Sequence, residues 1–389
     1  MPTILLTCGE TSGEQHAARL VRELKALDPS CRVLVLGGDT LAKAGAEVVH
    51  SIDRYAVMGF AEVLAKLPRF IALERSLRAL LAGGDIDLFI PVDYPGLNLR
   101  LSRYAKAAGV PVLYFISPQV WAWGAWRLQR MKRSIDLMAV ILPFEVELYR
   151  RAGISVVFAG HPMLEEIEPP ARTKEAPVPG ARFMVMLFPG SRRQEFERMF
   201  PALIAAARRI RERFAGATFT VALAPLVSEG AVRIPPDMRS CFRTTRAGIA
   251  ELGDAAIALA ASGTVTLQCA LSGTPTVVFY RTSPVTHAIG KLLVKIPWIA
   301  MPNVLSRRRI VPELIQSDAK PERIAEEAGS ILGDPARYRS MSADLISLRS
   351  ALEGPGGIRR IAGIALRMAA GEDPAEIARS FDDRPALRP

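Results

Sequence analysis

Short apolar segments that end in small-residue turns and lead into helical patterns recur along this chain of 389 residues. Two of the turns carry most of the information. Residues 184–188 form an apolar run that is followed by Pro189-Gly-Ser-Arg192, and a second apolar run ends at Ala261-Ser-Gly-Thr264. Turns of this kind expose backbone N–H groups at the start of a helix, where anions bind. The pair therefore predicts a cradle for a diphosphate.

Side chains in the two turns fit this role. Ser191 and Arg192 are expected to bind phosphate oxygens, because a guanidinium forks onto them and supplies countercharge. Ser262, Gly263 and Thr264 would assist from the second turn. Neither turn matches the Walker pattern or G-x-G-x-x-G, which favours a sugar nucleotide over ATP or NAD. Two capped helices with surface arginines are the alternative, with Thr264 as a plain helix cap.

The alternation of strand and helix patterns predicts an α/β fold with parallel sheets, and the length suits two domains. We expect domains over residues 1–165 and 183–345, with a proline-containing linker over 165–182. Residues 346–389 are expected to form C-terminal helices that end in a frayed tail, Glu372–Pro389. Strands are expected at residues 4–8, 32–36, 88–92, 112–116, 137–142, 156–159, 183–188, 217–223, 241–244, 255–260 and 275–279. The C-terminal helices either close back on the first domain or swap into a partner.

Polar residues follow the strands of the first half, at the sheet edge where α/β proteins bind ligands. They are Glu10, Ser12, Asp93 and Gln119. Asp93 is a candidate general base beside a bound hydroxyl, or else a turn carboxylate. No histidine pairs with a plausible nucleophile, and no metal site is expected.

Composition limits the classes of molecule that this chain is expected to bind. The net charge of +11 suits solvated faces, an anionic substrate or an anionic membrane surface, while no nucleic-acid-binding motif is visible. The four cysteines lie in apolar contexts and are expected to be reduced, as in a cytosolic protein. Neither a signal peptide nor an uninterrupted membrane span is predicted, so membrane contact would be peripheral.

Residues 58–81 carry apolar side chains at helical spacing with basic residues between them. The apolar positions are Phe60, Val63, Leu64, Leu67, Phe70 and Ile71. Pro68 predicts two short helices instead of one. This element either covers the sheet or meets lipid and acyl chains.

Many stretches, taken in order along the chain, resemble those of one family, the lipid A disaccharide synthases, which are two-lobed GT-B glycosyltransferases. The resemblance runs from about residue 3 to about residue 368. The matching stretches include Val57-Met-Gly-Phe-Ala-Glu-Val63, Phe89-Ile-Pro-Val-Asp-Tyr-Pro-Gly96, Ile116-Ser-Pro-Gln-Val-Trp-Ala-Trp123, Ile141-Leu-Pro-Phe-Glu145, Gly160-His-Pro162, Pro189-Gly-Ser-Arg192, Ala261-Ser-Gly-Thr264, Pro302-Asn303 and Val311-Pro-Glu-Leu314.

The resemblance implies two Rossmann-like lobes and an inverting transfer of 2,3-diacylglucosamine from its UDP derivative to 2,3-diacylglucosamine 1-phosphate (lipid X), which forms a β-1′,6 bond and releases UDP. Asp93 would be the base and Arg192 would offset charge on the diphosphate. Asn303 would contact the UDP end, and Glu10, Ser12 and Gln119 would line the acceptor side. The family implies no metal cofactor, a cytoplasmic location on the inner membrane of a Gram-negative cell, and leaves a homodimer open.

Two positions depart from the usual family residues. Glu14 stands where Asp is common, and Gln268 stands where Glu grips the donor ribose. Gln268 keeps hydrogen-bonding capacity but loses the charge. Two alternatives therefore stay open: a UDP-N-acetylglucosamine epimerase of the same architecture, and a non-catalytic paralogue that binds a lipid or a nucleotide sugar.

Overall fold

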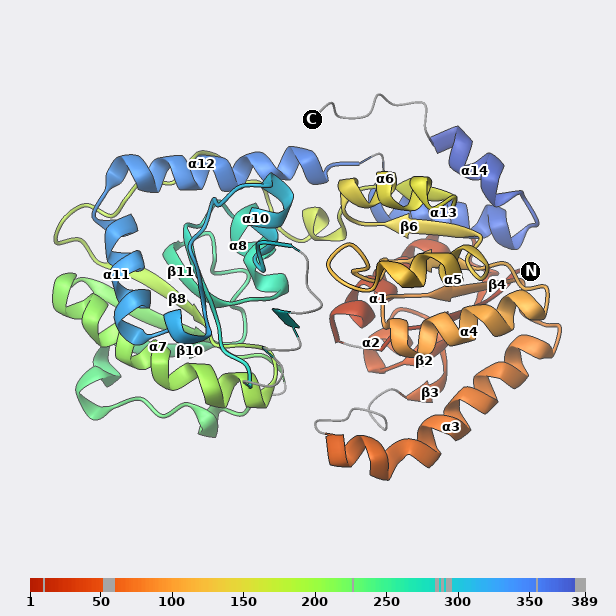
Figure 1. The fold of residues 1–389 in the computed structure, drawn as a ribbon, viewed down its shortest axis with the longest axis horizontal. Helices are drawn as coiled ribbons and strands as arrows, with labels where there is room; N and C mark the ends of the chain where they lie inside the picture. The colour runs from red at the N-terminus through yellow and green to blue at the C-terminus, as the bar shows by residue number, and fades with distance from the viewer. Residues whose placement is uncertain are drawn as a thin grey trace. The chain divides into compact units, whose positions relative to one another are not determined.

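The computed structural model describes residues 1–9, 11–51, 60–225, 227–283, 287, 290–291, 296–354 and 356–381 (Figure 1). The side chains of residues 11–12 and 60–67 lie outside this description. The chain forms two compact units. Unit 1 comprises Met1–Pro162 and Leu352–Pro389, and unit 2 comprises Met163–Ala351.

Unit 1 is built on parallel strands. One sheet has the order β3 (Glu47–Ser51), β2 (Arg32–Gly37), β1 (Thr3–Thr7), β4 (Leu88–Pro91), and a second has the order β5 (Leu113–Phe115), β6 (Leu137–Val140), β7 (Val156–Phe158). Parallel bridges from Phe89 to Val112 and from Val92 to Phe115 join β4 to β5. The loops that follow β1, β4, β5 and β6 therefore share one edge, where α/β folds bind ligands.

Helices cover both faces of these strands (Figure 1). Leu20, Ile361 and Ile377 bury one face, and Leu77, Leu101 and Tyr149 belong to the cluster on the other. The helices of unit 1 are α1 (Thr11–Leu27), α2 (Asp39–Lys43), α3 (Phe60–Ala82), α4 (Pro95–Ala107), α5 (Leu128–Lys132), α6 (Pro143–Arg151), α13 (Gly357–Ala369) and α14 (Pro374–Phe381). A short 3-10 turn, Ala125–Arg127, precedes α5.

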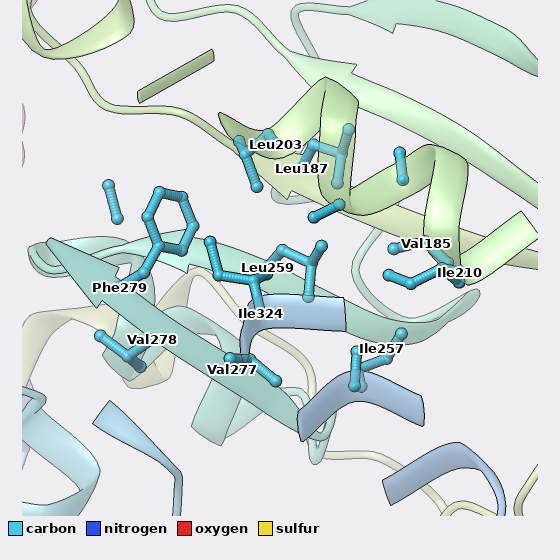
Figure 2. Close-up of a cluster of buried hydrophobic side chains, with 14 of the residues drawn as sticks. Val185, Leu187, Leu203, Ile210, Ile257, Leu259, Val277, Val278, Phe279 and Ile324 are labelled. Carbon is cyan, nitrogen blue, oxygen red and sulfur yellow. The ribbon is translucent and has the colours of Figure 1, made fainter. Parts of the chain in front are cut away.

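Unit 2 contains a six-stranded parallel sheet. Its order is β10 (Phe242–Thr245), β9 (Ala217–Ala222), β8 (Phe183–Phe188), β11 (Ala255–Ala261), β12 (Thr276–Tyr280), β13 (Glu313–Ile315). The helices are α7 (Arg193–Arg213), α8 (Thr264–Leu271), α10 (Met301–Ser306), α11 (Pro321–Leu332) and α12 (Pro335–Leu352). Figure 2 shows the core, where Leu187 and Leu259 of the sheet lie with Leu203 of α7 and Ile324 of α11.

Both units thus have the expected α/β fold, but two local predictions are wrong. Residues 60–82 form one helix that contains Pro68, instead of two short helices. A proline inside a helix costs about 3 kcal/mol, and the buried Leu73, Leu77 and Leu81 offset that cost by packing. The tail is not frayed up to residue 381, because α14 buries Ile377 and the Arg360 guanidinium lies 3.7 Å from the Phe381 ring centroid.

The chain leaves and re-enters unit 1 at two glycines that touch. A Cβ on Gly354 would lie 2.2 Å from the Gly160 nitrogen, and Gly160 has a φ of 106°. This contact allows two crossing hydrogen bonds, from His161 N to Leu352 O at 2.9 Å and from Gly357 N to Ala159 O at 3.0 Å. Helix α13 then packs on α1, so the C-terminal helices close back on the same chain in this structure.

The expected linker belongs to unit 2 and is held there by side chains. Arg349 of α12 donates to the carbonyls of Leu164 and Ile167 at 3.0 and 2.8 Å. The Lys174 ammonium donates to three carbonyls between residues 252 and 255 at 2.8–3.0 Å. Unit 2, Met163–Ala351, thus includes the residues expected to form the linker as well as the expected domain over residues 183–345.

Candidate functional site

Asp93 lies directly after β4, in a turn whose backbone is fixed on several sides. Asp93 and Tyr94 have φ values of 48° and 46°, a conformation that is uncommon for non-glycine residues and clusters at functional sites. The Asp93 N–H donates to Phe115 O at 3.0 Å. Its carbonyl accepts the Tyr114 hydroxyl at 2.6 Å and the Asn98 amide at 2.8 Å. The partly exposed carboxylate therefore starts from a rigid backbone at the ligand-binding edge.

Asn98 of α4 organises this turn, and sequence reasoning missed it. The residue is 0% exposed, and its Nδ2 also donates to Val92 O at 3.2 Å. Its Oδ1 accepts the Thr7 hydroxyl at 2.8 Å. Asn98 thus connects the ends of the neighbouring strands β1 and β4.

Of the other residues expected on the acceptor side, the structure describes the position of Gln119 but not those of the Glu10 and Ser12 side chains. Gln119 is exposed in the loop after β5, and its carbonyl accepts Ala122 N at 3.1 Å. Because β4 and β5 are neighbours, this loop and the Asp93 turn lie at the same edge. Glu10 and the Ser12 side chain lie outside the described residues. Glu14 accepts the Gly38 N–H at 3.1 Å, which stabilises the end of β2.

In unit 2, the first predicted anion-binding turn is exposed and already contains an anion. Ser191 and Arg192 are exposed, and their N–H groups donate to Oε2 of Glu195 at 3.2 and 3.3 Å. The Arg192 guanidinium lies 3.6 Å from Oε1 of Glu195. Gly190 is required, because a Cβ there would lie 2.6 Å from the Glu195 Cβ. The Glu195 carboxylate thus uses the donors expected to bind phosphate.

The second turn lies beside the first, because β8 and β11 are paired up to Phe188 and Ala260. Gly263 and Thr264 are exposed at the start of α8. The Ser262 hydroxyl donates to Ile299 O at 3.0 Å, so it holds the segment that precedes α10. Gln268 is buried within α8.

Asn303 occupies a more interior position than expected. It is 0% exposed, and its Oδ1 accepts the N–H groups of Ile310 and Val311 at 2.7 and 2.9 Å. Its Nδ2 donates to Val311 O at 2.9 Å and to Glu313 at 2.8 Å. Glu313 in turn accepts the N–H of Ile299 at 2.9 Å. These contacts give Asn303 the role of holding the start of α10, while its contact with UDP stays a prediction.

The element expected to meet lipid is the N-terminal part of α3. The side chains of Phe60, Val63, Leu64 and Leu67 lie outside the described residues, Phe70 is half-buried and Ile71 is 43% exposed. Within the part of the chain that the structure describes, no helix is long and apolar enough to cross a bilayer. Among the same residues, no three His, Cys, Asp or Glu side chains are grouped to hold a metal ion.

Solved structures resemble this chain at the level of the fold. The glycosyltransferase of kitacinnamycin has a TM-score of 0.64 at 17% identity, and the comparison covers 95% of this chain and 100% of that one. A UDP-N-acetylglucosamine 2-epimerase from Neisseria meningitidis, bound to UDP-N-acetylglucosamine, has a TM-score of 0.59 at 13% identity and covers 95% and 100%. The fold is therefore of the GT-B type expected.

Sequence relatives are more specific. The lipid-A-disaccharide synthase of Geobacter sulfurreducens is 40% identical over 375 residues, which cover 94% of this chain and 97% of that protein. The enzyme of the same name from Nitrosococcus oceani is 38% identical over 381 residues, with 96% and 97% coverage. A model of the family described as Lipid-A-disaccharide synthetase matches residues 4–360. This chain belongs to the lipid-A-disaccharide synthase family.

Proposed function

We propose that this chain transfers 2,3-diacylglucosamine from UDP-2,3-diacylglucosamine to lipid X, which yields the β-1′,6-linked disaccharide 1-phosphate and UDP. The family match over residues 4–360 is the observation that carries the proposal. The fixed Asp93 turn of unit 1 and the paired turns of unit 2 supply groups suited to this chemistry.

In the proposed step, Asp93 takes the proton of the acceptor hydroxyl as that oxygen bonds to C1 of the donor sugar. The bond between C1 and the diphosphate oxygen breaks, and its electron pair leaves on UDP. An inverting transfer needs such a base together with stabilisation of the leaving charge. Arg192, Ser191 and the 262–264 turn would stabilise the diphosphate.

Glu195 sets a condition on donor binding. Because its carboxylate accepts the N–H groups of Ser191 and Arg192, a diphosphate that uses those donors must displace it. A diphosphate and a carboxylate repel each other at such distances. We infer that donor binding moves the Glu195 side chain, while Arg192 turns from Glu195 to the phosphate.

We propose that the reaction needs no metal, with Arg192 and the helix starts providing the positive charge. Turnover in the presence of a chelator tests this directly. Unchanged rates support the proposal, and a rate restored only by added Mg²⁺ or Mn²⁺ would overturn it.

We further propose peripheral action at an anionic inner-membrane surface. Two exposed apolar side chains of unit 1 support this, Ile71 at 43% and Trp126 at 62% exposure. The guanidinium groups of Arg127 and Arg130 lie 5.2 and 5.1 Å from the Trp126 ring centroid, and aromatic and basic residues together suit a lipid interface. Co-sedimentation with vesicles of phosphatidylglycerol, compared with phosphatidylcholine, measures the effect.

The sequence leaves a homodimer open, and light scattering would show whether the chain forms one.

The decisive assay supplies the acylated donor and lipid X and identifies products by mass spectrometry. The proposal predicts UDP and a tetraacyl disaccharide phosphate. In a parallel reaction, unacylated UDP-N-acetylglucosamine should remain unchanged. Epimerisation of that sugar would instead identify the epimerase alternative, and UDP binding without turnover on either donor would identify a non-catalytic binding protein.

A further inference from the structure

A buried carboxylate in unit 1 has no part in the steps above. Glu145 lies in the first turn of α6, after β6, and is 2% exposed. Burial of an ionisable group is costly unless hydrogen bonds satisfy it. The hydrogen bonds of the buried Glu145 carboxylate therefore indicate its structural role.

The contacts of Glu145 connect two loops at the ligand-binding edge. Its Oε1 accepts the Ser117 hydroxyl at 2.5 Å and the Trp121 indole N–H at 3.1 Å. Its Oε2 accepts the Leu142 N–H at 3.1 Å. Ser117 and Trp121 flank Gln119 in the loop after β5, whereas Leu142 precedes α6.

Other contacts hold the same loop to α6. The Trp121 ring meets the Phe144 ring edge-on, with centroids 5.1 Å apart and planes at 86°. The Tyr149 hydroxyl donates to Pro118 O at 3.3 Å. Ile116, where the loop begins, has a φ of 62°, so the loop leaves β5 in a strained conformation. A strained backbone persists only where its surroundings hold it.

We propose that Glu145 is the positioning residue for the loop of residues 116–123, which it holds in the conformation that presents Gln119 to the acceptor. This inference deepens the proposed function and rests on it. Glu145 itself is enclosed by Ser117, Trp121, Leu142 and its own helix, and acts through the loop. Its effect should therefore fall on the acceptor and not on the UDP-binding turns of unit 2.

Burial and hydrogen bonding act in opposite directions on the ionisation of Glu145. The groups that face Glu145 are the Ser117 hydroxyl, the Trp121 indole, the N–H groups of Ile141 and Leu142, and the Tyr149 hydroxyl of its own helix. Four of these groups donate to the carboxylate and favour its ionised form. Burial raises the pKa of Glu145 to about 7, although the hydrogen bonds from Ser117, Leu142, Trp121 and Ile141 lower it. Because the enclosed carboxyl has a pKa above its ordinary value of 4.5, protonation favours the enclosed conformation, and the loop should be held more firmly below neutral pH than above it.

The test compares Glu145→Gln with Glu147→Gln. Glu147 lies on the same helix but is exposed and forms an ion pair with Arg151 at 2.6 Å. We expect Glu145→Gln to raise the KM for lipid X or lower kcat by at least tenfold, because the amide turns a donor toward other donors. Its Kd for UDP should stay within twofold of wild type, and the Glu147 variant should match wild type in all three. Equal kinetics for the two variants would overturn the proposal.

The pH profile separates positioning from a general loss of structure. For wild type, the KM for lipid X should rise as the pH increases through an ionisation near pH 7, and the Glu145→Gln variant should lack that ionisation. Glu145→Asp should restore it in part. Retention of the same ionisation by Glu145→Gln would contradict the proposal.

A readout without turnover keeps this inference distinct from the proposed function. Tryptophan fluorescence should titrate near pH 7 in wild type, because the Trp121 indole donates to Glu145. The transition should vanish in both Trp121→Phe and Glu145→Gln, and persist in Trp126→Phe. Absence of turnover in wild type would defeat the proposed function, whereas a titration unaffected by Glu145→Gln would defeat the role of Glu145.

Discussion

The Asn98 amide donates to the carbonyl of Asp93 at 2.8 Å, from a side chain with no solvent exposure. The candidate base is therefore positioned by the helix that follows it and not by its own loop alone. Asn98 also binds Thr7 and Val92, so the turn is tied to two strands.

Asn98→Ala should lower both stability and activity. Unsatisfied buried polar groups cost roughly 1–3 kcal/mol each, and Thr7 and Asp93 both lose a partner. Thermal unfolding and kcat measure the two effects. Ser102→Ala is the control, because Ser102 is also buried in α4 but donates only to Asn98 O, at 2.8 Å. It should lose stability with kcat unchanged; a normal kcat in Asn98→Ala would refute the role of Asn98.

Arg192→Ala should weaken UDP binding. Hydrogen bonds to charged groups contribute about 1.5–3 kcal/mol, which corresponds to roughly a 10- to 100-fold change in Kd. Arg193→Ala is the matched control, since Arg193 is exposed and pairs with Glu197 on α7 at 2.7 Å. Calorimetry should show a change in the first variant alone. If both variants bind UDP equally well, the diphosphate does not use this turn.

Gly160→Ala and Gly354→Ala should each destabilise the protein, because the added methyl meets backbone atoms of the other segment. Repulsion of this kind costs typically about 1–3 kcal/mol. Gly363→Ala in α13 has open space around the new methyl and should be neutral or stabilising by about 0.5–1 kcal/mol. Denaturant unfolding measures all three, and an unaltered midpoint in both clashing variants would contradict the close crossing.

Glu145 should also make stability depend on pH. Its folded pKa of about 7 exceeds the ordinary value of 4.5, so its contribution is fully present below about pH 4.5 and is lost as the pH rises through 7. Within that window the loss is roughly 1.4 kcal/mol per pH unit. The free energy of unfolding of Glu145→Gln, relative to wild type, should therefore improve between pH 5 and pH 8. A constant difference over this range would show that Glu145 does not titrate there.

The sequence was informative where structure follows from continuous apolar runs. The apolar runs correctly predicted the buried strands β1, β4, β8 and β11 and the turns that follow them. The edge strands β3 and β13 were missed, because β3 is partly exposed throughout and β13 is three residues long. Pro68 was misleading because packing in α3 outweighs a local preference.

Within the candidate site, the sequence pointed to Asp93, Gln119 and Arg192 but not to the side chains that hold these residues or their loops. Asn98, Glu145 and Glu195 are polar residues inside amphipathic helix patterns, where they resemble ordinary surface positions. Only Glu145 and Glu195 had a local signal, as the third residue of a helix after a strand turn. Their partners are set by long-range pairing of strands, which a single sequence does not display.

The most direct test of the central claim is acceptor-dependent release of UDP from UDP-2,3-diacylglucosamine by Asp93→Asn, with the exposed Asp85→Asn as control. A general base contributes about 10²–10⁴-fold to the rate, so kcat for Asp93→Asn should fall by that order while its Kd for UDP is preserved and Asp85→Asn behaves as wild type. Full turnover by Asp93→Asn, or no lipid X-dependent release by wild type, would contradict the account.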